Sequence, residues 1–75
     1  SWNVVKDEIE DYVANIVFQN IKILVGNDFL QEQITKNRQT DFIEELNLKL
    51  KVNYSEEIAQ KIIRSIYKIS ILKEI

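Results

Sequence analysis

The charged side chains of this chain gather in two short rows whose spacing could support chemistry. An acidic row lies near the N-terminus, where Asp7 and Asp11 fall on one side of a predicted helix. A basic row lies near the C-terminus and consists of Lys61, Arg64 and Lys68. Carboxylates at helical spacing could bind a metal ion or exchange a proton, and a row of cations could recognise an acidic partner.

The acidic row lacks the neighbours that a metal or acid–base site requires. The sequence contains no His, no Cys and a single Gly, so neither a third type of ligand nor a Gly-containing ligand loop accompanies the carboxylates. Nothing in the sequence indicates that they are buried. We interpret Asp7, Glu8, Glu10 and Asp11 as the solvated start of a helix, where acidic side chains suit the helix dipole.

The same absences argue against catalysis. A chain without His or Cys lacks the side chains that most often act as general base or thiol nucleophile. It also has no Gly-rich phosphate-binding loop and no pair of carboxylates that is predicted to be buried. We therefore expect no enzymatic activity, no metal ion and no cofactor.

Length and charge restrict the classes of partner. Seventy-five residues form one small helical domain, 1–75, whose stability must come from packing or oligomerisation because no disulfide can form. Ten basic and twelve acidic residues leave a net charge of −2, whereas a nucleic-acid-binding surface needs excess positive charge. No apolar run reaches the roughly 18 residues of a membrane span. We expect a protein or peptide partner, and neither nucleic acid nor a membrane.

Helical periodicity extends over most of the chain, which has no Pro and one Gly to interrupt it. We predict a first helix over about 3–25, ended by Gly26 in a left-handed conformation. The last helix is predicted to begin after Asn53 or Ser55 and to run to about Lys73.

Shorter helical segments are predicted between these two. Asn27 or Asp28 can cap the first segment, and Asp41 with Glu44 forms a capping box for the second. Six polar residues in a row, ending at Asp41, indicate a bend or loop. The predicted fold is therefore an all-α compact three-helix bundle whose middle helix can break near 37–40.

One stretch permits a different fold. Residues 46–52 alternate between apolar and polar side chains, which is typical of a strand, and 21–25 could pair with them in a two-stranded sheet. The alternative is a small α+β domain. We favour a helix because Leu46 and Leu50 also form an i,i+4 pair, and because Leu and Lys are better helix formers than strand formers.

The first and last helices carry more apolar surface than one core stripe requires. The first helix has a predicted core stripe of Val5, Ile9, Tyr12, Val13, Ile16, Ile23 and Leu24. Beside it lies a second stripe of Ala14, Val17, Phe18, Ile21 and Val25. The last helix has a core stripe of Ile58, Ile62, Ile66, Ile69 and Leu72, and a second stripe of Ile63, Tyr67 and Ile71 that Ile75 can extend.

The surplus stripes permit three interpretations. Both stripes of each helix can be core in a bundle, they can line an apolar groove that accepts a partner's amphipathic helix, or they can bury themselves against a second copy. In the groove interpretation the cations of the last helix would steer an acidic amphipathic helix. The predicted partner-binding residues are Ile9, Val13, Ile16, Val17, Ile21, Ile62, Ile63, Arg64, Tyr67, Lys68 and Ile71.

Three pieces of the chain resemble the KIX domain, the three-helix activator-binding module of transcriptional coactivators and Mediator subunits. Trp2, followed by Val5, Ile9, Val13, Val17 and Ile21, is similar to that family's Trp-led first helix. Residues 53–57 resemble its polar turn into the last helix, and Ile66-Tyr67-Lys68-Ile69 resembles a stretch late in that helix. We expect Trp2 to pack back on the first turns as an anchor.

The resemblance implies an intracellular adaptor, nuclear and involved in transcription, that binds short activation-domain helices. One groove would lie between the first and last helices, with Ile9, Val13, Ile16, Ile62, Ile63 and Tyr67 as its walls. A second surface would involve Val17, Ile21, Ile69 and the middle helix. The chain departs from the family at Ala59, where animal members carry a groove tyrosine, and near Ile71, where they carry a lysine. The rival class is a small homodimeric structural or regulatory protein, or a docking domain of a larger assembly.

Overall fold

A computed structural model describes the chain at residues 1–36 and 41–73, with side chains described as far as residue 69. Four helices account for nearly all of these residues: α1 (Trp2–Val25), α2 (Asn27–Lys36), α3 (Asp41–Asn53) and α4 (Glu56–Lys73). No strand occurs in the described ranges, so the all-α class is confirmed and the two-stranded sheet is not supported. The middle helix is two helices, α2 and α3; the predicted break at 37–40 lies outside the described residues.

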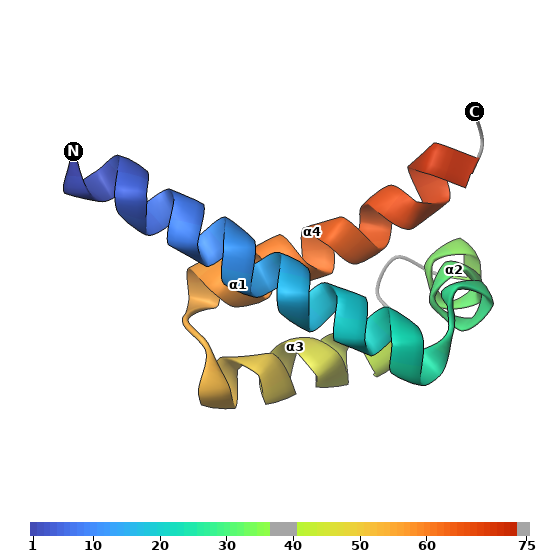
Figure 1. Ribbon diagram of the computed structural model, residues 1–75. Helices are drawn as coiled ribbons and strands as arrows, with labels where there is room; N and C mark the ends of the chain where they lie inside the picture. Colours follow the sequence, from blue (N-terminus) through green and yellow to red (C-terminus); the bar gives the residue numbers. More distant parts are fainter. Residues whose placement is uncertain (37–40, 74–75) are drawn as a thin grey trace.

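Helix α4 is the centre of the fold because it contacts each of the other three helices. In Figure 1, α1 crosses α4, α3 runs below the crossing, and α2 stands beside the C-terminal end of α1. The N-terminal turns of α1 extend past the rest of the molecule. The domain therefore encloses α4 from several sides and leaves α1 at its surface.

The core consists of apolar side chains from all four helices. On α4, Ile62 and Ile66 are fully buried and Ile58 and Ile69 pack partly buried against the core, as predicted, while the side chain of Leu72 lies outside the described residues. Ala59, which was not predicted to be core, is also fully buried. Leu30 on α2 is fully buried as well. The buried core comprises Ala14, Phe18, Leu30, Ile43, Leu50, Ala59, Ile62 and Ile66.

The corner between α1 and α2 depends on the only glycine. Gly26 has φ 88° and ψ 146°, a conformation that is strained for residues with a Cβ. Its N–H donates to the carbonyl of Lys22 at 2.9 Å, and its carbonyl accepts from Leu30 N–H at 3.2 Å. The positive φ is as predicted. Helix α2 begins at Asn27, so Asn27 and Asp28 lie within its first turn and not before it, as the capping prediction had placed them.

The start of α4 is capped as predicted. The Oγ of Ser55 accepts a hydrogen bond from the N–H of Ile58 at 3.2 Å, and its carbonyl accepts from Ala59 N–H at 3.0 Å. Two acidic residues, Glu56 and Glu57, occupy the first turn, where they suit the helix dipole. Ser55 is therefore the N-cap that fixes where α4 begins.

The stretch with alternating polarity lies within α3. Ile43 and Leu50 are buried, and Phe42 and Leu46 pack against the core, so one helical face of α3 makes the core contacts. Phe42 meets Phe29 of α2 edge-on, with ring centroids 5.0 Å apart. Tertiary packing along this face decides the helix, because a strand at 46–52 would turn alternate residues away from α4.

Candidate protein-interaction surface

One face of helix α1 packs against the rest of the domain. Ala14 and Phe18 are buried in the core, and Ile21 packs against it. One and two turns before Ala14, the carboxylates of Asp11 and Asp7 accept hydrogen bonds from Lys61 Nζ of α4, at 2.5 Å and 2.7 Å. Residues 7, 11, 14, 18 and 21 are separated alternately by four and three residues, as expected of a single face in contact with α4. We call these five residues the inner face.

Lys61 joins the charged part of the inner face to α4. Its side chain is 18% exposed, whereas those of Asp7 and Asp11 are more than half exposed. Hydrogen bonds to Asp11 and Asp7 raise the pKa of the Lys61 ammonium group above its usual 10.5. Both acids remain solvated, as predicted, but they also bind Lys61, a contact between α1 and α4 that the sequence did not predict.

The core stripe that the sequence predicted for α1 is wrong. Ala14 and Phe18, which were placed in the second stripe, are buried, and Val17 and Ile21 pack against the core. The predicted core residues Val5, Ile9, Tyr12, Ile16, Ile23 and Leu24 are instead exposed, and Val13 is partly buried. Two apolar stripes lie on opposite sides of this helix, and contact with α4 selects the one that contains Ala14.

The opposite side of α1 carries an exposed row of large apolar side chains from Trp2 to Ile23, which Gln19 interrupts once. Trp2 is 69% exposed, so the prediction that it packs back on the first turns is wrong. Even Ile16, the most covered member, is 43% exposed. This outer face comprises Trp2, Val5, Ile9, Tyr12, Ile16 and Ile23. Nothing in the described part of the chain covers it.

On α4 the predicted partner-binding residues occupy different environments. Ile62 is fully buried, and Ile63 and Tyr67 pack partly buried against the core. Arg64 and Lys68 are exposed. The side chain of Ile71 lies outside the described part of the chain. The apolar residues of α4 therefore chiefly serve the core, while its cations face solvent.

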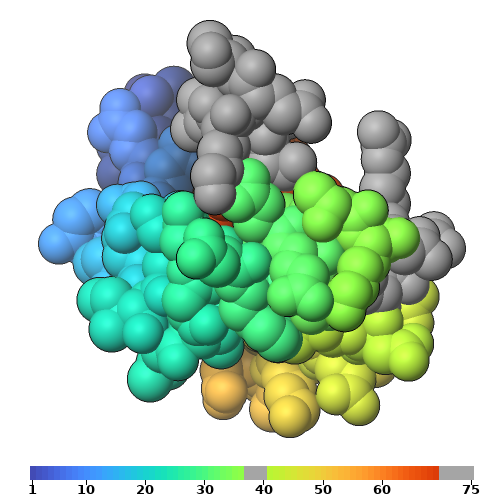
Figure 2. Space-filling model, turned by 90° about the vertical axis from the view of Figure 1, so that its right-hand side faces the viewer, coloured from blue at the N-terminus to red at the C-terminus, as the bar shows by residue number. Residues whose placement is uncertain are grey.

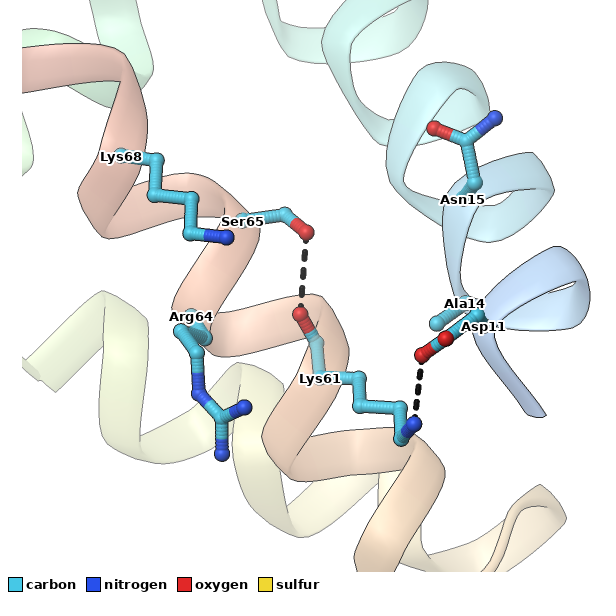
Figure 3. A pocket seen from close by; sticks show the side chains of 7 residues that line it. All are labelled: Asp11, Ala14, Asn15, Lys61, Arg64, Ser65 and Lys68. Carbon is cyan, nitrogen blue, oxygen red and sulfur yellow. Dashed lines mark hydrogen bonds and ion pairs between the residues drawn. The ribbon is translucent and has the colours of Figure 1, made fainter. Parts of the chain in front are cut away.

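The described hollows beside α4 are polar. One hollow lies between α1 and α4 and is shown in Figure 3. It is lined by Asp11, Ala14, Asn15, Lys61, Arg64, Ser65 and Lys68. Ser65 Oγ donates to the carbonyl of Lys61 at 3.0 Å, and Lys61 turns toward Asp11 across the hollow (Figure 3). A second hollow is lined by charged and amide side chains of α1 and α4. These hollows lack the apolar walls that the predicted groove requires.

The outer face has a regularity that the sequence analysis did not use. Its members are separated alternately by three and four residues, with Gln19 at the position between Ile16 and Ile23. This is the heptad spacing of a coiled-coil seam. The residue types and spacing were visible in the sequence, but apolar spacing alone does not show which side of a helix meets the core.

Comparisons with known proteins assign no family to this chain, so the candidate interaction surface rests on the geometry described above. The chain matches no protein-family model, no curated protein and no solved structure. The described residues hold no cluster of acidic side chains suited to a metal ion. In the same ranges, none of the four helices combines the length and apolarity needed to cross a lipid bilayer.

Proposed function

We propose that this chain is a protein–protein interaction module that binds an α-helix along the outer face of α1. The observation that carries the proposal is the exposed heptad row on that face. Soluble domains seldom leave large contiguous apolar patches uncovered unless the patch binds something. Because the row has coiled-coil spacing, a second helix is the shape that fits it.

Binding would follow from burial of the outer face. Each Å² of apolar surface removed from water contributes about 25 cal/mol, from which the cost of ordering the partner is subtracted. Trp2 and Tyr12 are the largest side chains of the row, and large aromatic residues often dominate such interfaces. The inner face holds α1 on α4, so the outer face is presented on a helix that is already folded.

The KIX-like alternative places the partner between α1 and α4 instead. Its proposed groove walls include Ile62, which is fully buried, and Ile63 and Tyr67, which pack against the core. The exposed cations Arg64 and Lys68 favour an acidic peptide near this position. The geometry supports the outer face better, because its apolar side chains are exposed before any partner binds.

The test is a titration of the ¹⁵N-labelled chain with an acidic amphipathic helical peptide whose Leu residues follow heptad spacing. We expect chemical-shift changes concentrated on the outer face, from Trp2 to Ile23. The variant Ile9→Lys/Ile16→Lys should abolish them while keeping the circular dichroism spectrum of the parent chain. Leu48→Lys, at an exposed apolar position of α3, is the matched control and should bind normally.

Two results would contradict the proposal. Shifts confined to Arg64, Tyr67 and Lys68 would support the groove between α1 and α4. A monomeric chain whose spectrum does not respond to the peptide would mean that the outer face does not bind a helix. The double variant separates specific binding from adhesion to any apolar residue, because Leu48 remains exposed in it.

A further inference from the structure

We infer that the helix covering the outer face of α1 is α1 of a second copy of this chain, running antiparallel to it. The inference rests on the proposed function, because it names the helix that binds the same face. It goes further by fixing the partner, the direction of the two helices and their register.

The seam itself supplies the first argument. Positions 2, 9, 16 and 23 take the first apolar place of successive heptads, and positions 5, 12 and 19 take the second. All are apolar except Gln19, and the apolar members are exposed. A seam of this kind is completed by another helix with the same spacing. Within the described residues, α1 is itself such a helix.

Charge complementarity selects the antiparallel arrangement. Glu8 and Lys22 both flank the seam on the same side, and they lie at nearly equal distances from its midpoint near residue 14. When two α1 helices run antiparallel about that midpoint, Glu8 of each copy lies beside Lys22 of the other. In a parallel pair Glu8 would face Val13, and no pair of opposite charges would form across the seam.

Glu8 can make this contact as it stands, whereas the half-buried Lys22 has to turn its ammonium group from Phe18 toward the seam. Glu8 is exposed and takes part in no ion pair among the described residues. Lys22 lies with its ammonium group 5.5 Å from the ring centroid of Phe18, and it makes no ion pair in the same ranges. Pairing Glu8 with Lys22 of a second copy would form two ion pairs in one dimer, one on each side of the two-fold axis.

The same register gives sensible pairs along the rest of the seam. The layers are Val5 with Ile23, Ile9 with Gln19, and Tyr12 with Ile16, each repeated by symmetry. At the two-fold axis Val13 meets Val13 on one flank, and Asn15 meets Asn15 on the other. The Asn15 amides can hydrogen-bond to each other on the flank, while Gln19 is the one polar side chain within the seam and lowers its stability.

The surroundings of α1 leave room for the second copy. In Figure 2, the C-terminal half of α1 forms the left-hand edge of the molecule, and α2 faces the viewer beside it. Trp2 of one copy would lie opposite Gly26 of the other, where no heavy atom lies within 4 Å of the place that a Cβ would occupy. The bulkiest side chain of the seam therefore meets a position with open space.

A charge-exchange experiment tests partner and direction together. Sedimentation equilibrium of the parent chain should show a dimer of twice 8.9 kDa that dissociates on dilution. Glu8→Lys alone and Lys22→Glu alone should each raise the dissociation constant by about tenfold or more, because each puts like charges together twice. An equimolar mixture of the two variants should restore dimerisation, since both cross-seam pairs then have opposite charges.

Matched controls and outcomes separate this inference from the proposed function. Glu45→Lys and Lys49→Glu make the same charge changes on exposed positions of α3 and should not alter the dissociation constant. A dimer that the mixture does not restore would overturn the antiparallel register. A chain that stays monomeric but binds the heptad peptide on α1 would overturn the second copy and retain the proposed function. A monomer that does not bind the peptide would overturn both.

Discussion

At the scale of single residues, burial rather than apolar character decides what a side chain does. Ile66 and Ile16 are chemically identical and lie in stripes of similar spacing. Ile66 is fully buried at the centre of the fold, whereas Ile16 is 43% exposed on α1. The first therefore stabilises the domain, and the second remains available for a partner.

Replacing Ile66 by Ala should lower the free energy of unfolding by about 2–5 kcal/mol, because it removes buried methylene groups and leaves a cavity among close-packed neighbours. Urea denaturation followed by circular dichroism measures the change. Leu48→Ala, at a position that is 66% exposed on α3, is the control and should change stability by about 0.5 kcal/mol or less. Equal losses for both variants would show that Ile66 is not in the core.

At the scale of elements, the corner after α1 and the contact between α1 and α4 have separate physical causes. Gly26 turns the chain by adopting a backbone conformation that other residues avoid. Lys61 joins α4 to two carboxylates of α1. Each of these features can be tested without altering the outer face.

Gly26→Ala should destabilise the domain by about 1–3 kcal/mol, because φ 88° strains any residue with a Cβ. The space around Gly26 is open, so strain rather than collision causes the loss. The change in thermal midpoint, compared with that of Asn20→Ala at an exposed position of α1, measures it. A neutral Gly26→Ala variant would mean that the corner adopts a different conformation.

The contact of Lys61 with Asp7 and Asp11 predicts that the stability of the fold falls at alkaline pH. The pKa of Lys61 is raised in the folded chain by Asp11 and Asp7, so the folded state holds this proton more tightly than the unfolded state. The resulting stability is fully present below pH 10.5, the usual pKa, and is lost as pH rises through the higher folded pKa.

Denaturation curves of the parent chain and Lys61→Met between pH 9 and 12 isolate this contribution, because the other titrating groups are common to both proteins. We expect the difference in unfolding free energy between them to shrink above about pH 10.5. A difference that is constant across this range would show that Lys61 is not bound by the two carboxylates.

The sequence predicted much of the fold but assigned the faces of α1 wrongly. Gly26, Ser55 and the stripe around Ile62 and Ile66 were identified correctly because local backbone preferences and a single apolar stripe carry the signal. Helix α1 has two apolar stripes on opposite sides, and periodicity weighs both equally. Ala14 and Asp11 lie on the side that meets α4. Only the packed structure shows which of the two apolar stripes is on that side.

At the scale of the whole molecule, the described residues form four helices, of which α1 is presented at the surface. Helix α4 contacts all three other helices and holds the core, while α1 has one face on α4 and one face outward. Stability and binding are thereby assigned to different sides of one helix. Changes on the outer face should alter association and leave the fold intact.

The most direct measurement uses spin labels, which the cysteine-free chain accepts at a single chosen position. Dimers labelled at Asn3→Cys or Glu10→Cys would be compared by double electron–electron resonance. With a rise of 1.5 Å per residue and antiparallel helices centred near residue 14, the axial separation is about 33 Å for labels at position 3 and about 12 Å at position 10. We predict a long distance for the first and a short one for the second. Equal distances at both positions, or no dipolar coupling at dimer-forming concentrations, would contradict an antiparallel second copy on the outer face of α1.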